Sequence, residues 1–298
     1  MIDLQRLARR ALARPLRFAL TVAGRVYVAG HDLGDAMVLA RRFADRGIAS
    51  TLGYFHSWKE SPAEIGSLSV SIIEAIAPLA PPAYISIKVP AFGYDPTVLA
   101  AIGQAARMHN VLMHLDSHEH ATADATRLCA QQAIDQGVRV GLSIPGRWRR
   151  SLEDADWASQ AGIRIRVVKG EWADPADPDR DLRAGFLGVV DRIAGKAREV
   201  AIATHDPWVA DQSIRSLLAA GSACELELLN GLPTRRIIEV GRKYGVPVRI
   251  YVPFGVAWRP YALAKAAENP RILWWAVRDS AVGLAMTLRR PRQSDRGD

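Results

Sequence analysis

Apolar and polar positions follow a regular rhythm of short and long segments along this chain. Eight short runs, rich in apolar and β-branched residues, recur at intervals of roughly 20–40 residues, and longer stretches with helical spacing of their apolar positions lie between them. The short runs cover residues 48–54, 84–89, 111–116, 138–144, 163–168, 200–203, 223–229 and 248–252. The helical stretches cover residues 33–46, 63–76, 96–107, 122–136, 152–161, 181–198, 208–219 and 234–244.

This alternation predicts parallel strands joined by helical crossovers. Eight such units in about 260 residues predict an α/β fold, a (β/α)8 TIM-like barrel. A doubly wound sheet is the alternative, but it normally carries a glycine-rich phosphate loop after an early strand, and the chain contains no G-x-G-x-x-G. One large barrel also suits a chain of 298 residues, of which 49% are apolar.

The net charge of +8 is concentrated at the two ends of the chain. Residues 1–25 carry six arginines and one aspartate, and residues 289–298 carry four arginines and two aspartates, which leaves +1 for residues 26–288. A nearly neutral body argues against a nucleic-acid groove, which needs clustered basic side chains. We expect a basic N-terminal helical arm over 1–25, the barrel over 26–288 and a disordered tail over 289–298.

The basic arm has two interpretations, because leucines alternate with its arginines. It could be a solvated amphipathic helix packed on the barrel, or it could lie on an anionic membrane surface. No apolar run approaches the length of a membrane span and no signal-peptide pattern is visible, so we expect a cytosolic protein that could touch the inner face of the membrane. Two cysteines, Cys129 and Cys224, predict neither a metal site nor a disulfide framework.

Polar residues end or follow several of the predicted strands, where a barrel of this kind places its catalytic groups. They are Lys88, Asp116, Arg166 with Lys169, Thr204-His205-Asp206, and Tyr251. A lysine that closes a buried strand is uncommon unless it is paired or binds a ligand, and an ion pair with Asp116 is the structural alternative for Lys88. For Asp116 the alternative is a helix or turn cap. We interpret His114, a lone strand histidine, as structural.

The stretch from Arg249 to Asn269 is the most informative segment. It predicts a strand that turns at Pro253 and Gly255 and re-enters a helix. One face of this helix carries Tyr261, Ala264 with Lys265, and Glu268 at helical spacing. A phenol, an ammonium and a carboxylate on one face suit a polar ligand better than a core.

This segment resembles the C-terminal signature of the proline dehydrogenase family, a strand "R-I-Y-x-P-x-G" that leads to a helix "Y-L-x-R-R-L-x-E-N". Arg166-Val-Val168-Lys169-Gly170-Glu171-Trp172 resembles the family's "R-L-V-K-G-A-Y". Further resemblances are "S-x-K" at Lys88, "I-D-x-E" at Asp116-Ser-His-Glu119, "A-T-H-N" at 203–206, "F-E-x-Q-x-L-x-G-M" over 225–231 and "T-L-D-Y-L-G-E" over 51–57. Together they span residues 26–284, most of the chain.

The resemblance implies a barrel that binds FAD and oxidises proline by hydride transfer from the carbon next to nitrogen to flavin N5, with a quinone as electron acceptor. For catalysis it implies Lys88, Asp116, Arg166 and Tyr251, with a hydrogen bond between Asp116 and Tyr251. For FAD it implies Arg166, Val168, Lys169, Gly170, Thr204, His205, Leu229 and Glu268. For substrate it implies Lys88, Tyr251, Tyr261, Ala264, Lys265, Ser57 and Trp172.

The chain departs from the family pattern at the substrate end. The two arginines of the last helix fall on Ala264 and Lys265, and the glutamate that pairs with the first of them falls on Ser57. Replacing two cations with one weakens carboxylate binding by roughly 2–4 kcal/mol. We therefore hypothesise a larger, substituted or less anionic cyclic or secondary amine as substrate, in place of ordinary free proline.

Other departures keep two further classes open. The family's flavin-contacting glutamine falls on Pro145, its asparagine on Asp206 and its strand-one aspartate on Gly53. Loss of cofactor contacts is what a non-catalytic, cofactor-free relative would show. A lysine at a strand end, Lys88 or Lys169, could also serve a Schiff-base lyase or aldolase.

Overall fold

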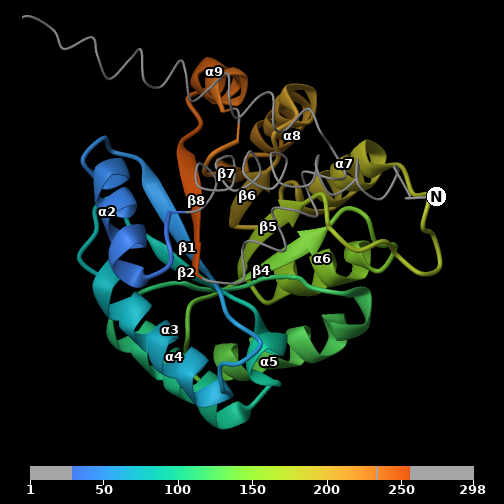
Figure 1. Cartoon of the computed structure of the whole chain (residues 1–298). Coiled ribbons are helices and arrows are strands. Elements are labelled where there is room, and N and C mark those ends of the chain that lie inside the picture. Colours follow the sequence, from blue (N-terminus) through green and yellow to red (C-terminus); the bar gives the residue numbers. More distant parts are fainter. Residues whose placement is uncertain (1–28, 233, 256–298) are drawn as a thin grey trace, which may run out of the picture.

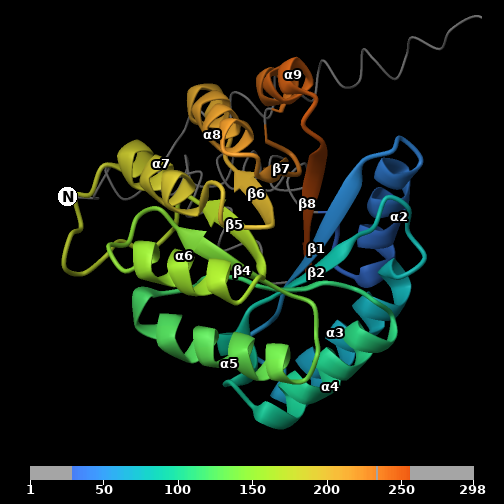
Figure 2. The same cartoon turned by 180° about the vertical axis from the view of Figure 1, so that it is seen from behind.

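Eight parallel strands close into a barrel in chain order, with β8 paired back to β1. This description comes from a computed structural model and covers residues 29–232 and 234–255. Figures 1 and 2 show the helices arranged around the outside of the strands. The expected arm over 1–25, the tail over 289–298 and the helix that carries Tyr261, Ala264, Lys265 and Glu268 lie outside the described residues.

The predicted (β/α)8 barrel is confirmed element by element in the described part of the chain. The strands are β1 Ala49–Phe55, β2 Tyr84–Ile87, β3 Met113–Leu115, β4 Val140–Pro145, β5 Arg164–Val168, β6 Glu199–Ala203, β7 Ala223–Leu229 and β8 Val248–Gly255. The helices are α2 Leu33–Ala44, α3 Pro62–Ile76, α4 Pro96–Met108, α5 Ala123–Asp135, α6 Ser151–Gln160, α7 Leu182–Ile193, α8 Pro207–Ala219 and α9 Arg235–Tyr244.

Local capping fixes where several helices begin. Ser61 and Glu64 form a capping box before α3, in which each side chain satisfies a backbone amide at the helix start. Asp181 is the N-cap residue of α7, and its carboxylate accepts hydrogen bonds from two backbone amides of the first turn. The predicted end of this helix at residue 198 is wrong, because α7 stops at Ile193 and the chain turns at Gly195 with φ +75°.

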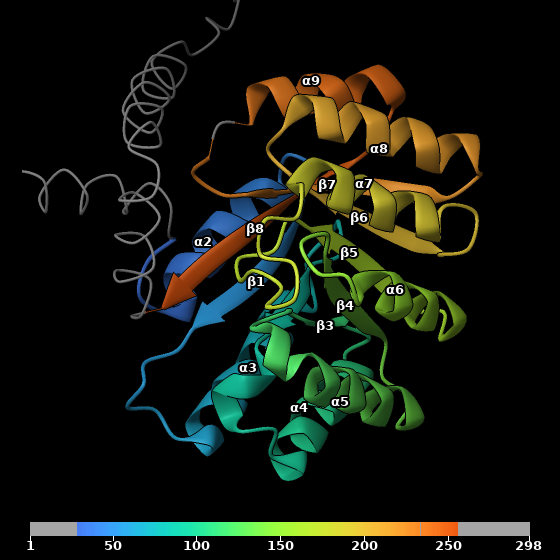
Figure 3. The ribbon, with the colours of Figure 1, turned by 90° about the vertical axis from the view of Figure 1, so that its right-hand side faces the viewer.

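The hydrophobic core lies between the sheet and the helices. Strand residues that point outward, such as Leu52, Ile165 and Leu226, are fully buried against the helix layer. Figure 3 shows α7, α8 and α9 on one side of the strands and α3, α4 and α5 on the other. Residues that alternate with these point inward, and many of them are polar. The interior of this barrel therefore differs from the branched apolar filling usual for the fold.

The expected turn at Pro253 and Gly255 is wrong, since both residues belong to β8. Pairing of β8 with β7 stops at Tyr251, whereas pairing with β1 continues to Gly255. Proline lies where β8 has a single partner strand, the setting in which a sheet tolerates a missing amide.

In the described residues, none of the helices has the length and apolar character needed to cross a bilayer.

Candidate active site

Two pairs of opposite charges span the inside of the barrel. Strand β5 points Arg164 and Arg166 inward, and β7 points Glu225 and Glu227 inward. Ala201 of β6 is in register with Arg166 on one side and Glu225 on the other, and its small side chain leaves room for the pairs to meet. Arg249 of β8 joins the pair formed by Arg164 and Glu225, with Nε 2.5 Å from Glu225 Oε1.

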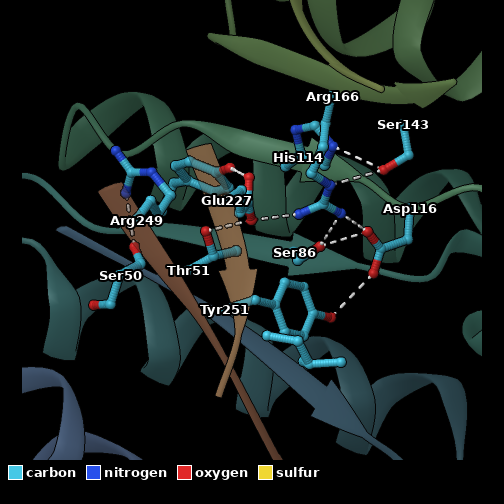
Figure 4. Close-up of polar contacts among 12 residues, drawn as sticks. Ser50, Thr51, Ser86, His114, Asp116, Ser143, Arg166, Glu227, Arg249 and Tyr251 are labelled. Atoms are coloured by element: carbon cyan, nitrogen blue, oxygen red, sulfur yellow. Dashed lines mark hydrogen bonds and ion pairs between the residues drawn. The ribbon is translucent and has the colours of Figure 1, made fainter. Parts of the chain in front are cut away.

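Arg166 lies at the centre of this arrangement and is only 4% exposed. Its Nε donates to Ser143 Oγ at 3.1 Å and its Nη1 to Glu227 Oε1 at 2.8 Å, while Nη2 donates to Ser86 Oγ at 3.1 Å and to Asp116 Oδ1 (Figure 4). Burial lowers its pKa, but Glu227 and Asp116 more than offset this and raise the pKa above its usual value. Arg166 is therefore a fixed cation with four acceptors for its five N–H groups.

Asp116 connects this cation to the barrel mouth, which we define by the strand ends Phe55, Ile87, Leu115, Pro145, Val168, Ala203, Leu229 and Gly255. Its carboxylate accepts from Ser86 Oγ at 2.7 Å and from Tyr251 Oη at 3.2 Å, the hydrogen bond that the resemblance implies. The alternative of a helix or turn cap is wrong, because both oxygens accept from side chains. Burial raises the pKa of Asp116, but Arg166 and Lys88 hold it below its usual range.

Lys88 follows β2 at the mouth, with a side chain that is 16% exposed. The predicted ion pair with Asp116 is present, with Nζ 3.6 Å from Oδ2, and Nζ also lies 4.3 Å from the centre of the Phe55 ring. Burial lowers the pKa of Lys88, and the pairing with Asp116 opposes that shift. Nζ also donates to the Tyr54 carbonyl at 3.4 Å, and this partly buried ammonium has capacity to bind another anion.

Tyr251 lies across the floor of the mouth. Its ring is 5.3 Å from the Arg166 guanidinium, and burial together with Asp116 raises the pKa of its phenol well above 10. The ring packs on the bare backbone of Gly53 in the neighbouring strand, where a Cβ would lie 2.8 Å from Cε1 and closer still to Oη. Gly53 thus leaves the space that Tyr251 occupies.

Histidines and a tryptophan flank Lys88 at the mouth. His118 stacks on Trp172 with ring centres 4.3 Å apart, and Trp148 Nε1 donates to the Trp172 carbonyl at 2.9 Å. Burial and the nearby Lys88 lower the pKa of His56. Burial lowers the pKa of His118 as well. These imidazoles are therefore neutral at pH 7.

The strand ends from β4 to β7 carry the residues expected at a cofactor. Gly170 has φ +91°, and a Cβ there would lie 2.8 Å from Pro145 Cβ, so only glycine fits. His205 Nε2 accepts from the Leu229 amide at 3.0 Å and thereby ties β6 to β7. Asp206 caps α8, and its carboxylate lies 2.7 Å from Arg183.

At the end of β1, the amide of Ser57 donates to the carboxylate of Glu60, and Tyr54 Oη donates to the same carboxylate at 2.5 Å. Burial, with Glu60 adding to it, raises the pKa of the Tyr54 phenol. Sequence reasoning placed no acid in this loop, because the family's glutamate falls on Ser57.

The structure brings Lys88, Asp116, Arg166 and Tyr251 into one network, although Arg166 and Tyr251 lie within their strands rather than at their ends. Val168, Lys169, Gly170, Thr204, His205 and Leu229 lie at the neighbouring ends of β5, β6 and β7. Sequence reasoning missed the inner partners Thr51, Tyr84, Ser86, Ser143 and Glu227. The sequence does contain a signal for Glu227. Arg164 and Arg166 in β5, and Glu225 and Glu227 in β7, are two residues apart in otherwise apolar strands, so each pair lies on one face of the sheet.

Curated proteins that are similar in sequence to this chain are named proline dehydrogenases. The chain is 25% identical over 271 residues to proline dehydrogenase 1 of Bacillus subtilis (strain 168), covering 85% of this chain and 89% of the relative. It is 26% identical over 266 residues to proline dehydrogenase of Deinococcus radiodurans, covering 82% and 86%. No family model matches the chain.

Solved structures show the same fold in longer proteins. Proline utilization A (PutA) of Bdellovibrio bacteriovorus inactivated by N-propargylglycine has a TM-score of 0.69 and 14% identity over 84% of this chain. PutA of Corynebacterium freiburgense has a TM-score of 0.62 and 17% identity over 93% of this chain. The match spans 33% and 35% of those two chains, so this chain corresponds to about a third of their length. These matches support the barrel fold, and the curated relatives bear out the resemblance to proline dehydrogenases that the motifs predict.

Proposed function

We propose that this proline dehydrogenase-like chain is an FAD-dependent oxidoreductase that acts on a proline-like cyclic or secondary amine. FAD, when bound, would supply the acceptor, at N5, for a hydride from the carbon next to the amine nitrogen. One observation carries the proposal. Lys88, Asp116, Arg166 and Tyr251 form one network at the mouth of a barrel whose sequence relatives are named proline dehydrogenases.

The substrate would bind beside Lys88 and Tyr251. Asp116 positions both, since it lies 3.6 Å from the ammonium and 3.2 Å from the phenol. Lys88 would bind an anionic group, and the Tyr251 ring would pack against the amine ring. Trp172, stacked on His118, would bound the site on another side.

The residues present fit a flavin. A buried guanidinium stabilises negative charge that develops on a ring when it is reduced, which is the role proposed for Arg166. The Asp206 carboxylate caps α8 and pairs with Arg183, which offsets its repulsion of a phosphate. The proposed FAD contacts are Arg166, Val168, Lys169, Gly170, Thr204, His205 and Leu229, with Glu268 outside the described residues.

Free proline is not the preferred substrate in this proposal. The family's paired arginines fall on Ala264 and Lys265, and the glutamate partner falls on Ser57, whose amide is bonded to Glu60. A single lysine binds a carboxylate as a flexible point charge, without the fixed fork of donors that arginine offers. The electron acceptor would be a quinone, and the basic arm over 1–25 would then contact a membrane surface.

The visible spectrum of the purified protein tests the proposal directly. We expect oxidised-flavin absorbance, release of FAD on denaturation, and bleaching on addition of a secondary-amine substrate. A colourless protein that takes up no added FAD would contradict it. Turnover of free proline with kcat/KM above about 10⁴ M⁻¹s⁻¹ would contradict only the restriction on substrate.

A Schiff-base lyase is the second candidate, favoured by one observation. Burial lowers the pKa of Lys88, which increases the fraction of neutral amine able to attack a carbonyl. Borohydride trapping of a carbonyl substrate on Lys88, in a protein without flavin, would select this function over the first.

A further inference from the structure

Glu227 is the most completely buried carboxylate in contact with Arg166. The residue is 3% exposed. Oε1 accepts from Arg166 Nη1 and from Thr51 Oγ1, both at 2.8 Å, and Oε2 accepts from Tyr84 Oη. These donors come from β5, β1 and β2, so hydrogen bonds from three strands fix the carboxylate across the barrel (Figure 4).

Glu227 remains ionised in this environment. Burial raises its pKa, but Arg166, Arg164 and Arg249 more than offset this and lower the pKa below its usual value. Asp116, the other carboxylate on Arg166, is also paired with Lys88. The four groups Lys88, Asp116, Arg166 and Glu227 therefore carry two positive and two negative charges, and the balance depends on Glu227.

We propose that Glu227 is a positioning residue that holds Arg166 in place and, by offsetting its charge, sets the reduction potential of the flavin at the barrel mouth. The proposal rests on the proposed function. Arg166 would favour the reduced ring because reduction adds negative charge beside a cation. A buried carboxylate behind that cation opposes this effect, since charges in a low-dielectric interior are weakly screened.

The test compares two glutamates of one strand. Glu227→Gln removes the negative charge that Glu227 places beside Arg166 and keeps the size of the side chain. Glu225→Gln is the matched control, because Glu225 pairs with Arg164 and Arg249 instead. The midpoint potential is measured by dye-coupled reduction of the FAD-loaded proteins.

We expect Glu227→Gln to shift the flavin reduction equilibrium at least tenfold toward the reduced form, a potential about 30 mV more positive for a two-electron couple. Glu225→Gln should shift it less than threefold. Glu227→Asp keeps the charge and should stay within threefold of wild type, and it remains a test if Glu227→Gln does not fold. An aspartate variant that shifts the equilibrium tenfold or more would show that charge is not the cause.

The outcomes separate this inference from the proposed function. A wild-type protein that binds no flavin contradicts both. A flavin-loaded Glu227→Gln protein with the wild-type potential, or with a shift matched by Glu225→Gln, overturns the role of Glu227 and leaves the proposed function standing.

Discussion

The contact between Tyr251 and Gly53 makes the sharpest prediction about the site. A methyl group at Gly53 would place Cβ 2.8 Å from Tyr251 Cε1 and closer to Cζ and Oη, whereas ordinary contacts begin at 3.4 Å. The ring must therefore move by more than half an ångström. Gly53 is absent from the glycines with positive φ, so Gly53→Ala strains the packing and not the backbone.

The cost follows from what the ring loses. Tyr251 Oη is 3.2 Å from Asp116 Oδ2, so a shift of this size takes it beyond hydrogen-bond range. A hydrogen bond to a charged group contributes about 1.5–3 kcal/mol. The stacking on Arg166, with 5.3 Å between the groups, contributes about 0.5–2 kcal/mol. We expect Gly53→Ala to lower the free energy of unfolding by about 2–5 kcal/mol, a fall in Tm of about 5–15 °C.

A double-mutant cycle with Tyr251→Ala isolates the contact. Without the ring, the three atoms nearest to the methyl group at position 53 are gone, so Gly53→Ala should change the free energy of unfolding by less than about 0.5 kcal/mol in that background. Denaturant unfolding of the four proteins without added FAD gives the coupling energy, which makes the measurement independent of the proposed function.

Gly188→Ala is the matched control. Gly188 lies within α7 with no atom within 4 Å of a built Cβ, and alanine there should stabilise the helix by about 0.5–1 kcal/mol. A steric contact between position 53 and the Tyr251 ring is refuted if Gly53→Ala is as harmless as Gly188→Ala, or if it costs the same with and without the ring.

Three further predictions concern charge. Asp116→Asn should destabilise the fold by about 3–5 kcal/mol in urea unfolding, because Arg166 and Lys88 lose their shared carboxylate, and a wild-type midpoint would refute this. Lys88→Met should raise KM for an anionic amine about 10–100-fold with a smaller effect on kcat, and an unchanged KM would exclude Lys88 from binding. Burial, with Arg166 adding to it, holds the pKa of His114 well below 6.5, so below pH 6.5 the unfolded chain binds a proton that the native state does not. The free energy of unfolding should therefore fall with decreasing pH by up to about 1.4 kcal/mol per pH unit from this residue. His114→Asn should reduce the slope to the part contributed by His56 and His118.

The strand positions could be predicted because parallel strands in this fold are buried and short. Strand β7 covers the predicted residues 223–229 without change. The errors have local causes. Helix α7 ends earlier than predicted because Gly195 turns the chain, while Ala197 beyond it is still buried and prolongs the apolar pattern. Strand β8 runs through Pro253 because one of its two neighbours has already ended.

The site was only partly predictable, because barrel closure decides which charges meet. Lys88 and Asp116 follow apolar strands and are recognisable from sequence alone. Arg164 and Arg166 alternate with apolar residues, which in an open sheet would place both arginines under the helices that cover one face. Only a closed barrel brings them opposite the glutamates of β7, 61 residues further on. In the sequence, Gly53 only marks a position where the family has an aspartate. The structure shows that its missing side chain makes room for the Tyr251 ring.

Tyr84 connects the two groups of ion pairs inside the barrel. Its hydroxyl donates to Glu227, while its ring lies 5.2 Å from the Arg164 guanidinium and 4.3 Å from that of Arg249. The ion pairs of Arg164 and Arg249 with Glu225 are therefore in contact, through Tyr84, with the carboxylate that holds Arg166. Buried ion pairs are weak sources of stability, since desolvation offsets most of their attraction. A barrel that fills its interior with them gains a rigidly held cation below the mouth, which an apolar filling of the same volume could not provide.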